Sequence, residues 1–240
     1  MTEGEDTNAD LWKSDAVVAN WAAQVGDREA RRRAQWELMA QLLPYREDED
    51  FTFLDLGAGM GAAAQVLLEC YPHAHAVLGE YSPPMIAAGT EAMARFGERA
   101  RYVEFDMGGA PWPEEIPTAL DAVVTSQCVH HLSDERKASL FAELFARLAP
   151  GGWYLNYDPV TSDDPVVDAA WQRANERQDP EAAEKARHLS PEAQARHENH
   201  VRYMIPLEPQ LGYLREAGFE AVDVYWKHLD YVIYGGRRPA

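Results

Sequence analysis

The sequence predicts an α/β protein with a seven-stranded, mostly parallel sheet, an antiparallel last strand and helices on both faces. Three observations lead to this prediction. Five short apolar runs alternate with helical or loop segments, a glycine-rich turn directly follows the first run, and two aromatic runs near the end are separated by only four residues. Alternating strands and crossovers give a parallel sheet, whereas so short a gap allows only antiparallel pairing.

The composition fits one domain that handles a small molecule. Of the 240 residues, 46% are hydrophobic and 26% are charged, which supplies a core without disulfide support. The formal net charge of −18 opposes binding to a nucleic-acid backbone. Two cysteines, an acidic start unlike a signal peptide and the lack of an apolar run of about 18 residues indicate a cytoplasmic protein without membrane contact. A homodimer is left open.

Short apolar runs bounded by turn residues mark the strands, because buried strands of parallel sheets have this pattern. The predicted strands are 51–56, 74–81, 100–107, 120–127, 153–158, 221–226 and 231–236.

Capping residues mark the helices between the strands. Residues 61–70 predict a helix after the first strand, and Ser82 is the predicted N-cap of a helix that ends at Gly97. Ser133 is the predicted N-cap of the helix before the fifth strand, and Gly218 ends the helix before the terminal hairpin.

Two segments lie outside the strand–helix alternation. Residues 1–10 are predicted to be a disordered acidic tail, and residues 11–240 a single domain that begins with helices over 11–45. Residues 161–205 are polar and hold three of the eight histidines, and their composition is helical. We interpret them as a helical lid inserted after the fifth strand.

The motif that most strongly indicates a binding site is DLGAGMG, from Asp55 to Gly61, between the first predicted strand and the helix after it. Glycines here let the backbone approach a ligand, and the helix N-terminus presents free N–H groups. Glu80 ends the second strand, 19 residues after Gly61, where an acid can accept hydrogen bonds from a ribose. Asp106 ends the third strand, so these acids share the carboxyl edge of the sheet, where open sheets bind ligands.

With these motifs the chain resembles the class I S-adenosylmethionine-dependent methyltransferases, from Phe51 to Arg237. Further matches are SQCVHHL after the fourth strand, LAPGG before the fifth and AGF before the hairpin. The resemblance implies a Rossmann-like fold and S-adenosylmethionine as cofactor, with Asp55 at the methionine part, Glu80 at the ribose and Asp106 at the adenine amine. The implied cofactor-binding residues are Asp55, Gly57, Ala58, Gly59, Gly61, Glu80, Tyr81, Asp106, Met107 and Gln127.

A nicotinamide dinucleotide is the rival cofactor. It favours G-x-G-x-x-G, in which the wider spacing fits the pyrophosphate. Here the third glycine comes one residue early and position 62 is Ala, so the sulfonium cofactor is the better prediction.

The resemblance implies methyl transfer to a small organic acceptor by in-line displacement, in which a base removes a proton from a hydroxyl or protonated amine. The base candidates are His131, Asp158, His197 and His200, with His130 beside them. His131 and Asp158 follow strands four and five on the cofactor edge; the alternatives are that His131 only lines the cofactor pocket and that Asp158 only initiates a turn.

Three residues are candidates for substrate binding. Arg196 and Arg202 could pair with a carboxylate, and Trp12 could place an aromatic surface over the site. A metal site of His197, His200 and Asp158 is conceivable, but residues at this spacing more often form a solvated face, so no metal is predicted. The alternatives to a methyltransferase are an enzyme similar to carboxy-S-adenosylmethionine synthase, based on GAA at 61–63, and a non-catalytic cofactor-binding subunit.

Overall fold

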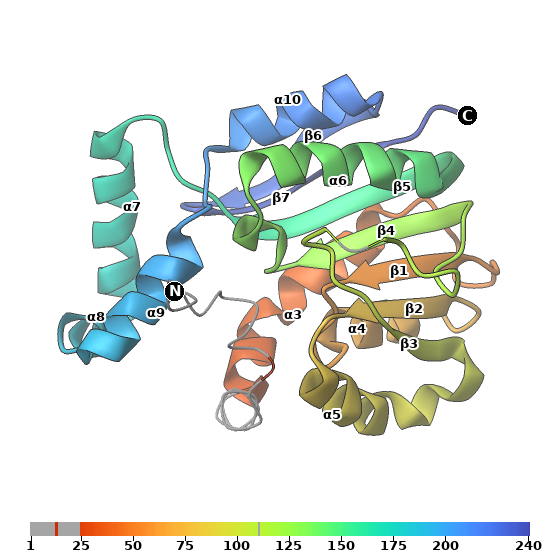
Figure 1. Cartoon of the computed structure of the whole chain (residues 1–240), viewed down its shortest axis with the longest axis horizontal. Helices are drawn as coiled ribbons and strands as arrows, with labels where there is room; N and C mark the ends of the chain where they lie inside the picture. Colours follow the sequence, from red (N-terminus) through yellow and green to blue (C-terminus); the bar gives the residue numbers. More distant parts are fainter. Residues whose placement is uncertain (1–12, 14–24, 110) are drawn as a thin grey trace, which may run out of the picture.

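The computed structural model describes residues 13, 25–109 and 111–240, and all statements of structure concern this part of the chain. The tail predicted over 1–10 and the first part of the helices predicted over 11–45 lie outside it. The described chain forms one seven-stranded sheet, in the order β3-β2-β1-β4-β5-β7-β6, with helices on both faces (Figure 1).

Each predicted run corresponds to a strand, although the ends of some strands differ. They are β1 Thr52–Leu56, β2 His75–Glu80, β3 Ala100–Glu104, β4 Leu120–Ser126, β5 Leu148–Pro159, β6 Glu220–His228 and β7 Tyr231–Arg237. Strands β1 to β5 pair in parallel, while β7 is antiparallel to both β5 and β6. The prediction of a mostly parallel sheet with an antiparallel last strand is therefore confirmed.

The helices cover the faces of the sheet and extend beyond one end of it. They are α3 Val25–Leu42, α4 Ala62–Cys70, α5 Pro83–Met93, α6 Asp134–Arg147, α7 Pro165–Gln178, α8 Pro180–Arg187, α9 Pro191–Val201 and α10 Leu207–Ala217, with 3₁₀ turns η1 Ala94–Arg99 and η2 Val129–His131.

The sheet is buried on both faces, which explains its continuous apolar runs. One core lies under α6 and α10 and contains Leu54 of β1, and the other lies under α3 and α4 and contains Phe53. Successive side chains of β1 thus point to opposite cores, as the pleat requires. Burial on both sides makes the sheet a fixed platform for the residues at its carboxyl edge.

Both predicted serine caps are present. The Ser82 Oγ accepts from the Met85 N–H at 3.3 Å, and the Ser133 Oγ accepts from the Arg136 N–H at 3.3 Å. The helix predicted to end at Gly97 differs: its α-helical part ends at Met93, and a 3₁₀ stretch follows, in which Gly97 has a φ of 56°.

Strand β5 begins at Leu148, five residues earlier than predicted. Leu148 pairs with Leu120 ahead of a register shift in the ladder, so the strand starts before the glycine pair that the sequence places in a turn. A bulge of this kind leaves little trace in the hydrophobic pattern.

The segment predicted over 161–205 is helical and forms α7, α8 and α9, which extend beside the sheet (Figure 1). Its two ends meet, because Thr161 bridges to Pro206 and the Thr161 N–H donates to the Ile205 carbonyl at 3.2 Å. We call α7 to α9 the helical insertion; its function as a lid stays a prediction. Within the described ranges, none of the helices combines the length and apolarity needed to cross a membrane.

Candidate functional site

The glycine turn after β1 is held in a left-handed backbone conformation at three positions. Gly57, Gly59 and Gly61 have φ values of 74°, 55° and 86°, which residues other than glycine rarely adopt. A Cβ on Gly57 would lie 2.7 Å from the Cys128 Sγ, whereas a Cβ on Gly59 would meet nothing within 4 Å. Gly57 is therefore needed for packing, and Gly59 leaves an open approach to the backbone.

Two buried acids hold this turn and the start of α4. The Asp55 carboxylate accepts from the Ala64 N–H at 3.0 Å, and burial raises the pKa of Asp55 to about 7. Glu80 accepts from the Gly59 N–H at 2.7 Å and from the Ser82 N–H at 2.8 Å, and burial also raises its pKa. Glu80 thus fixes the backbone of Gly59, a contact that the sequence spacing alone does not reveal.

The other predicted cofactor residues surround the same edge. A Cβ on Gly57 would lie 3.1 Å from the Met107 Cε, so Met107 is adjacent to the turn. The Asp106 Oδ1 accepts from the Gly108 N–H at 2.7 Å just beyond β3. Gln127 follows β4 with a φ of 59°, and its side-chain Nε2 is buried without a hydrogen-bond partner in the described structure.

The tyrosine hydroxyl of Tyr102, on β3, was not anticipated from the sequence. It donates to the Gly59 carbonyl at 3.1 Å and lies where a Cβ on Gly61 would be 2.9 Å away. With Glu80 on the N–H and Tyr102 on the carbonyl, both backbone polar groups of Gly59 are bonded to side chains of neighbouring strands. The turn is therefore held in place by side chains of the protein itself.

A buried histidine–aspartate pair lies after β4. The His130 Nδ1 is 2.7 Å from the Asp158 Oδ1, and the His130 backbone N–H donates to the Asp158 Oδ2 at 2.8 Å. The two side chains are 2% and 1% exposed. Because a carboxylate only accepts, the Nδ1 of neutral His130 carries the proton and its Nε2 has a lone pair. Both Asp158 oxygens are used to hold His130, so Asp158 orients this ring.

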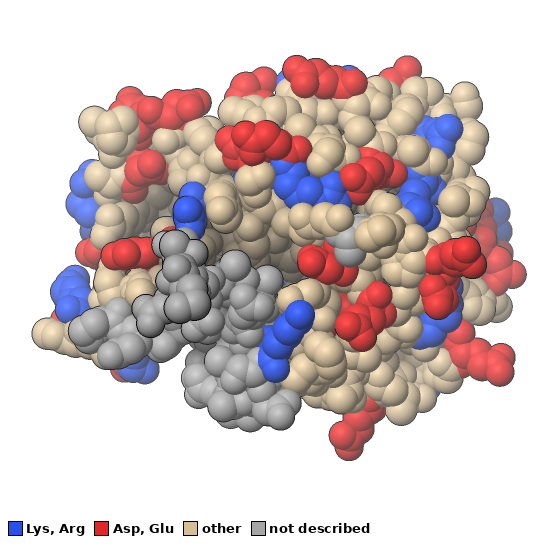
Figure 2. Space-filling view, in the orientation of Figure 1, with Lys and Arg blue, Asp and Glu red and all other residues tan. Residues whose placement is uncertain are grey.

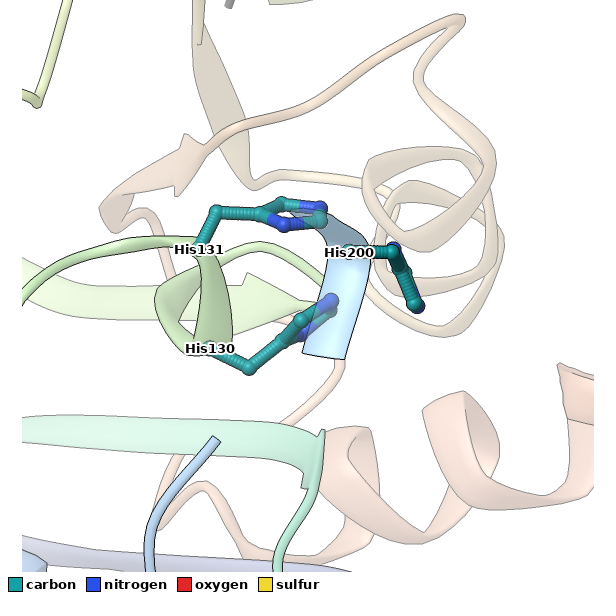
Figure 3. A group of neighbouring side chains, drawn as sticks. All are labelled: His130, His131 and His200. Carbon is teal, nitrogen blue, oxygen red and sulfur yellow. The ribbon is translucent and has the colours of Figure 1, made fainter. Parts of the chain in front are cut away.

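Three imidazoles converge at this point. The ring centroid of His130 lies 3.9 Å from that of His131 and 4.8 Å from that of His200, and the last two are 4.9 Å apart. We call these residues the histidine cluster (Figure 3). Burial lowers the pKa of His131 to about 2, and partial burial lowers that of the more exposed His200 to about 4. Both rings are therefore neutral at pH 7.

The cluster is joined to the glycine turn through Cys128. The Cys128 Sγ donates to the Leu56 carbonyl at 3.2 Å and is the atom that a Cβ on Gly57 would strike. His130 and His131 follow two and three residues later, in η2. Cofactor turn and histidine cluster therefore occupy one edge of the sheet.

A buried lysine connects the cluster to the helical insertion. The Lys137 Nζ donates to the Leu132 carbonyl at 2.8 Å and to the Tyr203 carbonyl, and it is fully buried. The first carbonyl follows η2 and the second follows α9. The sequence did offer a signal: Lys137 falls on the apolar stripe of α6 with Leu140, Phe141 and Leu144.

Two of the remaining predicted residues, His197 and Arg202, do not join the cluster. His197 is exposed on α9, and Arg202 is exposed with its guanidinium 5.4 Å from the Tyr203 ring centroid. Trp12 and the side chain of Arg196 lie outside the described structure. His130 was only one of several base candidates in the sequence, and the structure gives it the most defined environment of them.

The exposed surface reflects the composition. Acidic side chains are spread over the face in Figure 2, and Lys and Arg lie among them, without a single large basic patch on that face.

Comparison with known proteins agrees with this geometry. Residues 53–152 match the family model described as methyltransferase domain. The demethylmenaquinone methyltransferase of Thermus thermophilus is 34% identical over 122 residues, which are 51% of this chain and 50% of that protein. The chain thus spans about half the length of the curated relatives it matches.

Solved structures show the same fold over nearly the whole chain. Human N-acetylserotonin methyltransferase, in complex with SAM, superposes with a TM-score of 0.66 and 16% identity, covering 100% of this chain and 61% of that one. An O-methyltransferase family protein from Burkholderia thailandensis superposes with a TM-score of 0.67 and 16% identity. The match covers 98% of this chain and 63% of that one.

Sheet order, glycine turn and acid positions define the Rossmann-like fold of S-adenosylmethionine-dependent methyltransferases. Residues 53–152 match the methyltransferase domain family, and the fold around them is that of class I S-adenosylmethionine-dependent methyltransferases. The resemblance found in the sequence is confirmed.

Proposed function

We propose that this protein binds S-adenosylmethionine at the carboxyl edge of β1, β2 and β4 and transfers its methyl group to a small organic acceptor. The observation that supports this most is the contact of the buried Glu80 carboxylate with the Gly59 N–H, at 2.7 Å. An acid that can accept hydrogen bonds from ribose hydroxyls thus lies directly beside Gly59, the glycine of the turn at which an added Cβ would meet nothing within 4 Å.

The residues present fit this cofactor. Asp55 would hold the methionine part, Glu80 the ribose and Asp106 the adenine amine, as in the family that the sequence resembles. The unpartnered Gln127 amide supplies a buried donor, which is costly to leave unsatisfied and therefore suits a ligand. When bound, S-adenosylmethionine supplies an electrophilic methyl group on a sulfonium.

The histidine cluster is the part of the site that would receive the acceptor. An acceptor hydroxyl, thiol or protonated amine must lose a proton, and the neutral imidazoles of His131 and His200 offer lone pairs for this task or for holding the acceptor. The helical insertion brings His200 to the cluster and would exclude water from the reacting groups. We propose a small molecule as the acceptor, with no nucleic acid or membrane involved, in keeping with the net charge of −18.

Calorimetric titration with S-adenosylmethionine tests the cofactor site. Glu80→Gln should weaken binding by about 1.5–3 kcal/mol, or roughly 10- to 150-fold, because charge-assisted hydrogen bonds are lost. Glu104→Gln is the matched control, since Glu104 is exposed and pairs with Glu80 in the β2–β3 register. Equal affinities for wild type and Glu80→Gln would place the ribose elsewhere.

Turnover tests the activity itself. Labelled S-adenosylmethionine is mixed with panels of phenols, quinols, thiols, amines and carboxylic acids, and labelled product is sought. Transfer to one class establishes the reaction. Tight cofactor binding without transfer to any class, together with a stably bound second polypeptide, would instead favour a non-catalytic subunit.

A further inference from the structure

The histidine cluster has the donor set of a transition-metal site. In the described structure, one ligand nitrogen from each of His130, His131 and His200 lies within 4.8 Å of the others. We propose that these three side chains bind a divalent transition-metal ion such as Zn²⁺. Nitrogen ligands from three histidines are a common zinc donor set in which a fourth position stays open.

His130 is the most specific evidence. Its Nδ1 is held by Asp158 at 2.7 Å, which leaves the lone pair on Nε2, and this Nε2 is buried without a hydrogen-bond partner in the described part of the chain. A carboxylate that fixes the far nitrogen of a histidine is the usual support of a metal-binding imidazole. A buried acceptor without a partner destabilises the folded state, and a bound ion would offset that cost.

The second requirement is that the rings can reach one ion. Zinc–nitrogen bonds of about 2.0–2.1 Å in a tetrahedron place the nitrogens about 3.4 Å apart. The ligand nitrogens now lie within 4.8 Å of one another, which is a larger separation, so the site must contract to bind an ion. His200 is the most exposed of the three rings and lies on α9 of the helical insertion, so a change of its rotamer can supply this movement.

Lys137 holds the two halves of the proposed site together. Its Nζ donates to the carbonyl of Leu132, the residue after His131, and to the carbonyl of Tyr203, three residues after His200. The ligands from η2 and α9 are thereby kept close without an ion. This differs from the metal site weighed in the sequence, which used His197 as a ligand and Asp158 directly.

The role of the ion follows from its place in the site, and this step rests on the proposed function. An oxygen or sulfur acceptor bound at the open position would release its proton to solvent and present an anion to the cofactor edge. The ion would thus favour hydroxyl or thiol acceptors that can bind a metal. The metal site itself does not depend on methyl transfer.

The test uses the untagged full-length chain, freed of metal with a chelator and titrated with CoCl₂. Tetrahedral Co²⁺ gives intense visible d–d bands, which should saturate at one equivalent and be displaced by ZnCl₂. His200→Ala and His131→Ala should each weaken Co²⁺ binding at least 10-fold. His188→Ala is the control, because it removes an imidazole that is exposed and paired with Glu184. Thermal melting of each variant verifies folding.

The absence of one-equivalent binding by either Co²⁺ or Zn²⁺, or binding that is unchanged in both His200→Ala and His131→Ala, would overturn the metal site. Calorimetry with S-adenosylmethionine on the metal-free protein is run in parallel. Cofactor binding without metal binding refutes only this inference and leaves the cluster to act as a base. Metal binding without cofactor binding refutes only the proposed function.

Discussion

The two halves of the site are built in different ways. The cofactor half consists of one turn and the start of α4, fixed by Glu80 and Asp55 from adjacent strands of a sheet that is buried on both faces. The histidine half joins a 3₁₀ turn after β4 to His200, 70 residues further along the chain on an inserted helix. The first half is therefore determined locally, and the second exists only when the insertion packs against the sheet.

This difference separates two tasks. A cofactor shared by many enzymes can be recognised by a rigid turn common to the fold. An acceptor that differs between enzymes can be selected by a segment inserted after β5, which can change without altering the cofactor turn. Variants should accordingly divide into those that abolish cofactor binding and those that impair transfer while cofactor affinity is retained.

The largest effect is expected for Gly59→Val. Gly59 has a φ of 55° and an open Cβ direction, so a branched side chain would occupy the approach to the backbone and strain it. The affinity for S-adenosylmethionine, measured by calorimetry, should fall at least 100-fold, or by roughly 3 kcal/mol. Gly97→Val is a matched control, because Gly97 has a φ of 56°, has open space and lies in η1. A Gly59 variant that binds normally would contradict the assignment of the turn.

Asp158→Asn should affect the other half. In wild type, the charged Asp158 carboxylate accepts hydrogen bonds from both the Nδ1–H and the backbone N–H of His130. The neutral asparagine amide has only one oxygen and cannot accept both, so the His130 ring loses its fixed tautomer. We expect turnover and Co²⁺ affinity to fall on the order of 10- to 100-fold, with S-adenosylmethionine affinity unchanged. The measurement pairs steady-state kinetics with the cobalt titration. Loss of cofactor affinity in this variant would show that the two halves are not separable.

The same division decides what the sequence could predict. Strands, serine caps and the acid–glycine pattern of the cofactor half are local features, and they were predicted close to their observed positions. The end of α5 and the start of β5 were displaced because a 3₁₀ stretch and a register shift depend on tertiary pairing.

The histidine half could be predicted only in part. The pair His130–His131 is visible in the sequence, but the sequence does not show that the two rings come together in a 3₁₀ turn, and only the contact with Asp158 distinguishes His130. The approach of His200 depends on how the helical insertion packs. Lys137 is the one residue there whose position, on an apolar stripe, could have revealed a buried polar contact.

Lys137→Met tests whether the insertion is held in place by this contact. Methionine fills a similar volume but leaves the carbonyls of Leu132 and Tyr203 without their donor, at a cost of about 1–3 kcal/mol in unfolding free energy. Amide hydrogen exchange should accelerate in α9, and Co²⁺ affinity should fall several-fold. The amides of the glycine turn serve as the internal control; acceleration there as well would indicate general destabilisation rather than release of α9.

The cofactor half should also show a pH dependence. Burial raises the pKa of Asp55 from its ordinary value of 3.8 to about 7, so between these values the folded state binds this proton more strongly than the unfolded state. The stabilisation from this carboxyl is complete below about pH 4 and disappears as the pH rises through 7. Asp55→Asn removes that dependence, so urea unfolding without cofactor should show the variant gaining stability relative to wild type from pH 5 to pH 8. A parallel pH profile in both proteins would mean that Asp55 is already ionised in the folded state, and that the turn tolerates its charge without a ligand.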